Sequence, residues 1–328
     1  MQTAWAAARE DLAAQGISYP VRGRSTQHGR AAGALLGRRM AGRSEIEPIA
    51  TWERLTRRVA RRTDRAIVSS ELFADLTDEH IRTAVAQLGG TDLRVLITLR
   101  PLEALLASVW QQDVKGCRPQ DYSQWLSERL DGPQTGPFWL RHAHDRLVTR
   151  WAAELGPDRV TVLVVDPRQS ERLLRDVEGL AGIRTGTLQP QLGNRSLSAQ
   201  EAEFLRAFHE QLDGRLSVER YQRWVRLGAF RGLVENRSAG PSETPIATPP
   251  AAVRQARDLH RPMVERILAS GVNVVGDPGA LLPEHDPAAD ADVVDLREKT
   301  VAQIPVDAAV AFALGLVDAV IREDEASN

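Results

Sequence analysis

Cysteine is nearly absent from this chain of 328 residues, in which Cys117 is the only one. A single cysteine excludes an intramolecular disulfide, and with it the disulfide framework of small secreted domains. Long apolar runs are also missing, since no window approaches the roughly 20 residues of a membrane-spanning helix. The first residues include Arg9, Glu10 and Asp11, which the uncharged core of a signal peptide would not contain. We therefore expect a soluble, cytoplasmic protein that does not associate with membranes.

Lysine is scarce as well, and neither sign of charge dominates. Lys115 and Lys299 are the only lysines, and the formal net charge is −2. Because the chain has no global positive field, its composition argues against nucleic acid or an anionic membrane surface as a partner. Arginines recur at helical spacing between Arg54 and Arg65, which is more typical of a solvated helix face than of an anion-binding patch.

Three short segments have the pattern of buried strands, because they are rich in β-branched residues and bounded by polar turns. They are residues 66–70, 94–99 and 159–165. Continuous apolar runs of this kind favour parallel strands that are covered on both faces. Helical periodicity fills the sequence between them. We therefore expect a three-layer α/β fold with these strands side by side in a parallel sheet, within a single domain that spans residues 1–328.

The C-terminal portion is predicted to be mainly helical. Helical periodicity covers residues 198–212, 251–269 and about 303–322, with a short strand at 272–275. Ser198 followed three positions later by Glu201 forms a capping-box pattern at the start of the first of these helices. The Pro-, Gly- and Ser-rich stretch 236–250 is interpreted as a mobile loop beside a site. Residues 323–328 form an acidic tail.

The carboxyl end of the second predicted strand carries the most informative residues. Arg100 follows this strand, and Pro101 stands at the first helical position, which proline favours. Ligands of open α/β sheets bind beyond the carboxyl ends of the strands, and the free N–H groups of a helix N-terminus suit phosphate. Arg100 adds a planar fork of donors, and Ser108 adds a hydroxyl two turns later. The alternative is that Arg100 pairs with a carboxylate and Ser108 only packs.

This segment resembles the part of sulfotransferases that binds the 3′-phosphate of their donor. In that family a strand ends in Arg, a Pro usually follows within two residues, and a Ser stands eight positions after the Arg, the spacing of Arg100 and Ser108. The flanking residues look like those of actinobacterial sulfotransferase-like proteins. Looser likenesses extend over nearly the whole chain. They are found at residues 15–20, 69–73, 138–139, 150–152, 155–160, 194–198 and 271–277.

The resemblance implies a P-loop-like sulfotransferase fold and a defined reaction. A sulfuryl group would pass from the co-substrate 3′-phosphoadenosine 5′-phosphosulfate to a hydroxyl or amine of a small molecule or glycan, without a metal. Such a transfer needs a base for the acceptor's proton and donors that stabilise the leaving phosphate. Family members use His or Glu as the base. Glu71 is the first candidate, with an N-cap or turn carboxylate as the alternative. His28 is the second, because its loop is expected over the same edge. Ser69 and Ser70 are expected to donate hydrogen bonds to the acceptor or sulfate.

One feature of the family is missing from this sequence. Sulfotransferases begin with a strand and a Lys-Ser/Thr-Gly-Thr-Thr-like loop that cradles the 5′-phosphosulfate, whereas the first residues here resemble the helix beyond that loop. Neither Lys115 nor Lys299 stands where it could replace the loop lysine. We therefore expect poor sulfate transfer from the chain as written, and a start codon further upstream that would add the strand and loop. The alternative is a catalytically degenerate relative that still binds nucleotide.

Two other groups of residues suggest chemistry but have simpler explanations. His142 and His144 are two positions apart on a predicted helix and point to nearly opposite sides, so a shared metal ion is not expected. Several tryptophans stand in helical sequence, where core packing is a better explanation than stacking on a nucleotide base. They are Trp110, Trp125, Trp139 and Trp151.

Overall fold

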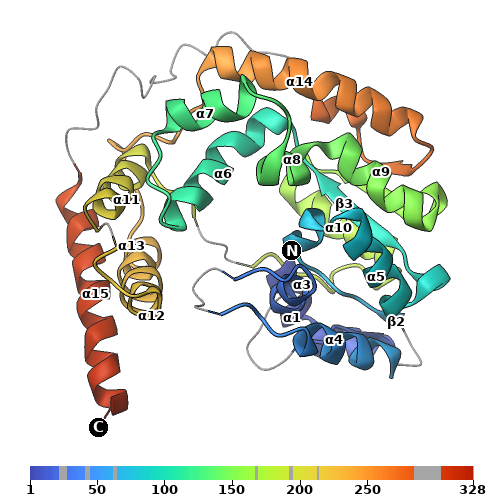
Figure 1. Ribbon diagram of the computed structural model, residues 1–328, viewed down its shortest axis with the longest axis horizontal. Helices are drawn as coiled ribbons and strands as arrows, with labels where there is room; N and C mark the ends of the chain where they lie inside the picture. The colour runs from blue at the N-terminus through green and yellow to red at the C-terminus, as the bar shows by residue number, and fades with distance from the viewer. Residues whose placement is uncertain are drawn as a thin grey trace.

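The computed structural model describes residues 1–21, 28–40, 45–61, 65–166, 169–191, 195–212, 214–283 and 304–327. This part of the chain is mainly helical (63%), with two small parallel sheets of two and three strands. Figure 1 shows an arch in which a lobe with both sheets is joined to a group of helices by α6 (Leu102–Lys115), α7 (Tyr122–Leu130) and α14 (Pro250–Ala269). The predicted α/β class is confirmed.

Three parallel strands form the larger sheet. Their order is β3 (Val95–Leu99), β4 (Val160–Val164) and β5 (Asn273–Val275). Val95 of β3 lies opposite Val160 of β4, and the register continues to the ends of both strands. The predicted segments 94–99 and 159–165 are therefore parallel neighbours, as their apolar runs indicated. The predicted short strand near the C-terminal end adds the third member.

The segment 66–70 does not join this sheet, and the prediction of three adjacent strands was wrong here. Only Arg65–Ala66 forms a strand, β2, which pairs in parallel with β1 (Ile17–Ser18). One further bond extends the pairing, from the Ile67 N–H to the Ser18 carbonyl at 2.8 Å. The apolar pattern of 66–70 marks an extended, partly buried segment, but it does not specify which backbone lies beside it.

Helices cover both faces of the larger sheet. Alternate side chains of a strand point to opposite faces, and Val162 and Leu163 of β4 accordingly lie in different core clusters. The Val162 face is covered by α5 (Asp78–Leu88), α9 (His144–Leu155) and α14. The Leu163 face is covered by α1 (Gln2–Ala7), α2 (Arg9–Ala13) and α10 (Ser170–Ala181). The sheet is thus the middle of three layers.

β3 is an edge strand in the described part of the chain, because β4 is its one strand neighbour there. Ile97 and Leu99 are buried on the side of α9, whereas Leu96 (38% exposed) and Thr98 face outward. The N–H and C=O groups along such an edge can accept another strand.

The remaining elements of this lobe are short. They are α3 (Gly29–Leu35), α4 (Ala50–Ala60), α8 (Gly136–His142) and the 3-10 helices η1 (Glu71–Asp75), η2 (Gly90–Asp92), η3 (Pro157–Arg159) and η6 (Pro278–Leu281).

The other end of the arch is built from helices alone. Its elements are α11 (Ala199–Leu212), α12 (Val218–Arg220), the π-helix η5 (Tyr221–Ala229), α13 (Phe230–Glu235) and α15 (Val306–Ser327). Their core continues into α6, α7 and α8 and includes the buried side chains of Trp110, Trp125 and Trp139. Trp151 is buried in the sheet lobe. The predicted packing role of these tryptophans is confirmed. None of the described helices has the length and apolar character needed to cross a membrane.

A buried charge network fastens the predicted loop 236–250 to the helices. Arg237 is 6% exposed at its side chain and pairs with Glu201, Glu243 and Asp307. The Ser198 hydroxyl accepts from the Glu201 N–H at 3.1 Å and the Glu201 carboxylate accepts from the Ser198 N–H at 3.0 Å, so the predicted capping box is confirmed. The mobility of this loop stays a prediction, and movement would have to break these bonds.

Substitutions at covered positions of the sheet should lower the free energy of unfolding more than substitutions at uncovered positions. Leu163→Ala removes a fully buried side chain from β4, so we expect the free energy of unfolding in urea to fall by about 2–5 kcal/mol. Leu96→Ala, on the outward side of β3, should change it by less than about 0.5 kcal/mol. Equal losses in the two variants would contradict the layer arrangement described above.

Candidate functional site

Arg100 lies directly beyond the carboxyl end of β3. The pairing with β4 holds the backbone at this point, since the Val165 N–H donates to the Leu99 carbonyl at 2.8 Å. Pro101 is the N-cap of α6, so the helix begins one residue later than predicted, at Leu102. The strand end, Arg100 and the helix N-terminus therefore follow each other as the sequence indicated, at the edge where ligands of parallel sheets bind.

Arg100 has no ion-pair or hydrogen-bond partner among the described residues, and its Nε atom is buried. Leaving a buried guanidinium N–H without an acceptor costs free energy. The nearest acidic residue in the sequence is Glu103 in the first turn of α6; its Oε1 accepts from Arg257 at 2.9 Å, and its Oε2 is buried without a described partner. The expected alternative, an Arg100–carboxylate pair, is therefore not found in the described chain, and the guanidinium of Arg100 has donors to offer.

The first turns of α6 are partly occupied by other contacts. The Leu102 N–H donates to Nδ1 of His260 at 3.4 Å. The Ser108 hydroxyl donates to the Leu105 carbonyl within the helix at 2.8 Å, so it would have to turn to reach a phosphate. No bond in the described chain joins Ser108 to Arg100. Their joint role in a phosphate subsite stays a prediction.

The other predicted site residues gather where the β2 segment ends. The His28 N–H donates to the Ser69 carbonyl at 3.1 Å, and the Ser69 N–H donates to Nδ1 of His28 at 3.0 Å. Ser70 is the N-cap of η1, with its hydroxyl accepting from the Leu72 N–H. Glu71 is the first residue of η1. His28, Ser70 and Glu71 are thus brought together, as the predicted position of the His28 loop required.

Within this cluster, Glu71 is better placed than His28 to accept a proton. Glu71 is exposed, and its carboxylate accepts a hydrogen bond from the neutral side-chain amide of Gln2 at 2.7 Å. His28 is buried, and burial lowers its pKa to about 4 against the opposing hydrogen bonds of the Ser69 and Pro20 backbone. Nδ1 of His28 lies against the Ser69 backbone, 3.0 Å from its nitrogen and 3.3 Å from its carbonyl oxygen, and Nε2 is buried. Burial of both ring nitrogens therefore disfavours the protonated form of His28, whereas the exposed Glu71 carboxylate can be reached by an acceptor.

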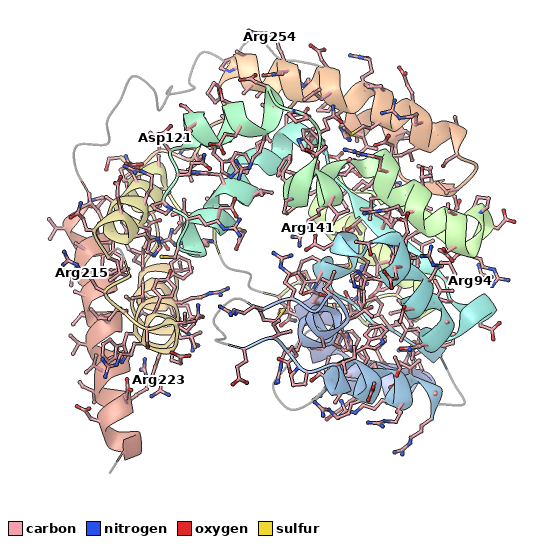
Figure 2. All side chains as sticks on the ribbon, viewed as in Figure 1. Arg94, Asp121, Arg141, Arg215, Arg223 and Arg254 are labelled. Carbon is pink, nitrogen blue, oxygen red and sulfur yellow. The ribbon has the colours of Figure 1, made fainter. Side chains whose placement is uncertain are left out.

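A cluster that the sequence did not predict fixes η1 against the rest of the lobe. Asp75 is buried, and its carboxylate accepts two hydrogen bonds from Arg141, at 2.8 and 2.6 Å, and one from Arg38 at 2.8 Å. Figure 2 shows Arg141 on the inner side of the arch. Two guanidinium groups on one carboxylate leave a net positive charge beside the element that carries Glu71. The partners are far apart in the sequence, so no local pattern could have revealed them.

The histidines considered for metal binding are packed in the core. His142 and His144 lie with their ring centres 6.4 Å apart, and Nδ1 of His144 is 2.9 Å from Nε2 of His260. Among the described residues, no group of three or more His, Cys, Asp or Glu side chains is arranged to hold a metal ion. Asn194, which stands in one of the looser family likenesses, lies outside the described residues.

Buried histidines should make the fold sensitive to acid. Burial is the main cause of a lowered pKa in five histidines. The pKa falls well below 6.5 for His144 and to about 4 for each of the other four. The set is His28, His142, His144, His209 and His260. Unfolding restores ordinary pKa values near 6.5, so the unfolded chain binds more protons between pH 6.5 and 4. Stability is therefore full above pH 6.5 and falls as the pH drops through this window, by about 1.4 kcal/mol per pH unit for each proton taken up.

Urea unfolding at pH 7.5, 6.0 and 5.0 measures this loss directly. A free energy of unfolding that stays constant or rises over this range would contradict it.

Comparison with known proteins does not assign the chain to a family. No protein-family model, no curated protein and no solved structure matches the chain. The two groups of candidate residues, Arg100 and Ser108 beyond β3, and His28, Ser70 and Glu71 around η1, therefore have to be interpreted from their own chemistry. No hydrogen bond or ion pair between the two groups is found in the described chain.

Proposed function

We propose that this protein is sulfotransferase-like and binds the 3′-phosphate of 3′-phosphoadenosine 5′-phosphosulfate, or of its product, at Arg100. The observation that carries the proposal is the guanidinium of Arg100, which has a buried Nε and no described partner at the carboxyl end of a parallel strand. A phosphate would supply the missing acceptors through paired N–H···O bonds. The spacing to Ser108, shared with the sulfotransferase family, is what selects this phosphate among others.

The surroundings of Arg100 support binding of an anion. Glu103 is the acidic side chain in the first turn of α6, and its pairing with Arg257 offsets its charge. The dipole of α6, a helix of 14 residues, places partial positive charge at the same end. Ser108 would contribute its hydroxyl after leaving the Leu105 carbonyl. Arg100 would thus supply most of the binding free energy, with Ser108 as a secondary contact.

In the proposed reaction the acceptor oxygen or nitrogen attacks sulfur, the bond from sulfur to the bridging phosphate oxygen breaks, and 3′-phosphoadenosine 5′-phosphate leaves. The acceptor's proton passes to a base. Glu71 fits this role because its carboxylate is exposed and shared only with a neutral amide among the described residues. The arginines on Asp75 would stabilise negative charge next to η1.

A second candidate is a nucleotide-binding protein without transferase activity. Two of the polar side chains near η1 already make hydrogen bonds within the fold: the Ser70 hydroxyl caps η1, and Nδ1 of His28 accepts from the Ser69 N–H. The sequence also shows no phosphate-cradling loop with a lysine. Both candidates share the Arg100 subsite, so binding and turnover have to be tested separately.

Binding is tested by calorimetry with 3′-phosphoadenosine 5′-phosphate. Arg100→Ala should lose roughly 1.5–3 kcal/mol of binding free energy, which is about a 10- to 150-fold loss of affinity, because charge-assisted hydrogen bonds disappear. Arg94→Ala is the matched control, since Arg94 is exposed at the opposite end of the same strand (Figure 2). Adenosine 5′-phosphate lacks the 3′-phosphate, so Arg100→Ala should not change its affinity. Equal losses for both nucleotides, or none, would place the subsite elsewhere.

Turnover is tested by following sulfate transfer from the donor. In a catalytically complete form of the protein, Glu71→Gln should lower turnover by about 10²–10⁴-fold while the affinity for 3′-phosphoadenosine 5′-phosphate persists. Gln2→Ala removes the hydrogen bond to Glu71 but keeps the carboxylate, so it should retain turnover. If Glu71→Gln remains active and His28→Ala does not, the base is His28. Nucleotide binding without any transfer would favour the second candidate.

A further inference from the structure

α15 is fixed to the helical end of the arch by contacts between glycines. A Cβ atom added to Gly315 would come within 2.5 Å of the Gly228 carbonyl oxygen, and one added to Gly232 would come within 2.7 Å of the Ala311 carbonyl oxygen. The backbones of α15, η5 and α13 therefore touch. On the same side of α15, Ala308 and Phe312 are buried. This side of α15 already has its partner within the chain.

The opposite side of α15 is apolar as well, but it is exposed. We name it the α15 stripe, and it consists of Val306 (78% exposed), Val310 (50%), Leu314 (58%), Val317 (51%) and Ile321 (49%). Steps of three and four residues keep these side chains on one face of a helix. A helix that is apolar on opposite sides is normally buried, and a continuous exposed stripe marks an interaction surface. Figure 1 shows α15 at the outer edge of the molecule, where a partner can reach it.

We propose that the α15 stripe binds the α15 stripe of a second copy of this chain, with the two helices antiparallel. The stripe is complementary to itself in this orientation. When Leu314 of one copy lies opposite Val317 of the other, Val310 falls opposite Ile321, and the same pairs recur on the other side of the two-fold axis. The alternation of four- and three-residue steps from Val310 to Ile321 is that of a coiled-coil seam.

Charge favours the antiparallel orientation over the parallel one. The C-terminal end of α15 is acidic, with Glu323, which pairs with Arg223, and the exposed Asp324. Parallel helices would bring the two acidic ends together. Antiparallel helices place each beside the N-terminus of the other helix, where the acidic side chain of the first turn, Asp307, is paired with Arg237. The same charges argue against a membrane as the occupant, because membrane-surface helices carry many Lys and Arg residues and Arg322 is the only one in α15.

A groove beside the stripe extends the surface available to a second copy. It has a volume of about 720 Å³ and lies between α15 and the η5–α13 segment, with the touching glycines Gly228, Gly232 and Gly315 in its floor. Leu227, on the η5 wall, is 61% exposed. Asp318 lines the α15 wall, next in sequence to Val317. Charged side chains from both walls line the groove, such as Arg231 and Asp318, and no stripe residue does, so the groove adds charged groups beside the apolar stripe.

The test is the mass of the protein in solution by light scattering after size exclusion. The wild-type chain should show twice the 36.2 kDa of one copy. Leu314→Glu and, separately, Val317→Glu should give monomers with unchanged far-ultraviolet circular dichroism. Leu268→Glu is the matched control, because Leu268 is equally exposed (51%) but lies on α14, and it should remain dimeric. A monomeric wild type, or a dimer that persists in both stripe variants, would overturn the proposal.

Orientation is tested by cross-linking in a Cys117→Ser background. Val310→Cys mixed with Ile321→Cys should give disulfide-linked dimers, whereas each variant alone should give few, since residue 310 of one copy lies about 16 Å along the helix axis from residue 310 of the other. Efficient cross-linking of Val310→Cys alone would show parallel helices and overturn the proposed arrangement. Both tests are independent of nucleotide binding, so their outcome does not depend on the proposed function.

Discussion

The parallel pairing of β3 with β4 is the contact on which the rest of the lobe depends. β4 is buried on both faces and lies between the two other strands of its sheet, so α9 on one side and α10 on the other are positioned by its alternating side chains. The same pairing ends at the bond between Leu99 and Val165. That bond sets the point where the chain leaves the sheet, and therefore where Arg100 stands.

Sequence patterns succeeded where one segment determines its own structure. The apolar runs at 94–99 and 159–165, and the capping box of Ser198 and Glu201, need only local periodicity or a three-residue spacing. They failed where the structure of a segment depends on contacts with residues far away in the sequence. The segment 66–70 has the composition of a strand, but its strand part is short and is paired with β1 rather than β3.

The candidate site divides in the same way. Arg100 could be placed at a strand end from sequence, and the likeness to sulfotransferases singled it out. That no carboxylate among the described residues pairs with it became visible only in the structure. The His28 loop was expected over the edge that carries Glu71, yet the buried ring of His28 and its bond to Ser69 could not be predicted, because burial depends on elements from several parts of the chain. The Asp75 cluster joins η1 to α8 and to the segment after α3, and it has no sequence signal at all.

The order of the strands also determines when the protein can fold during synthesis. Val95 and its partner Val160 are 65 positions apart, and Thr161 and its partner Asn273 are 112 positions apart. Contacts between such distant residues form slowly, because a long loop has to close before any pairing is gained. A ribosome must therefore release most of the chain before β5 can cover the second edge of β4. Until then that edge of β4 has no strand beside it, and unpaired edges of this kind are open to association with other chains.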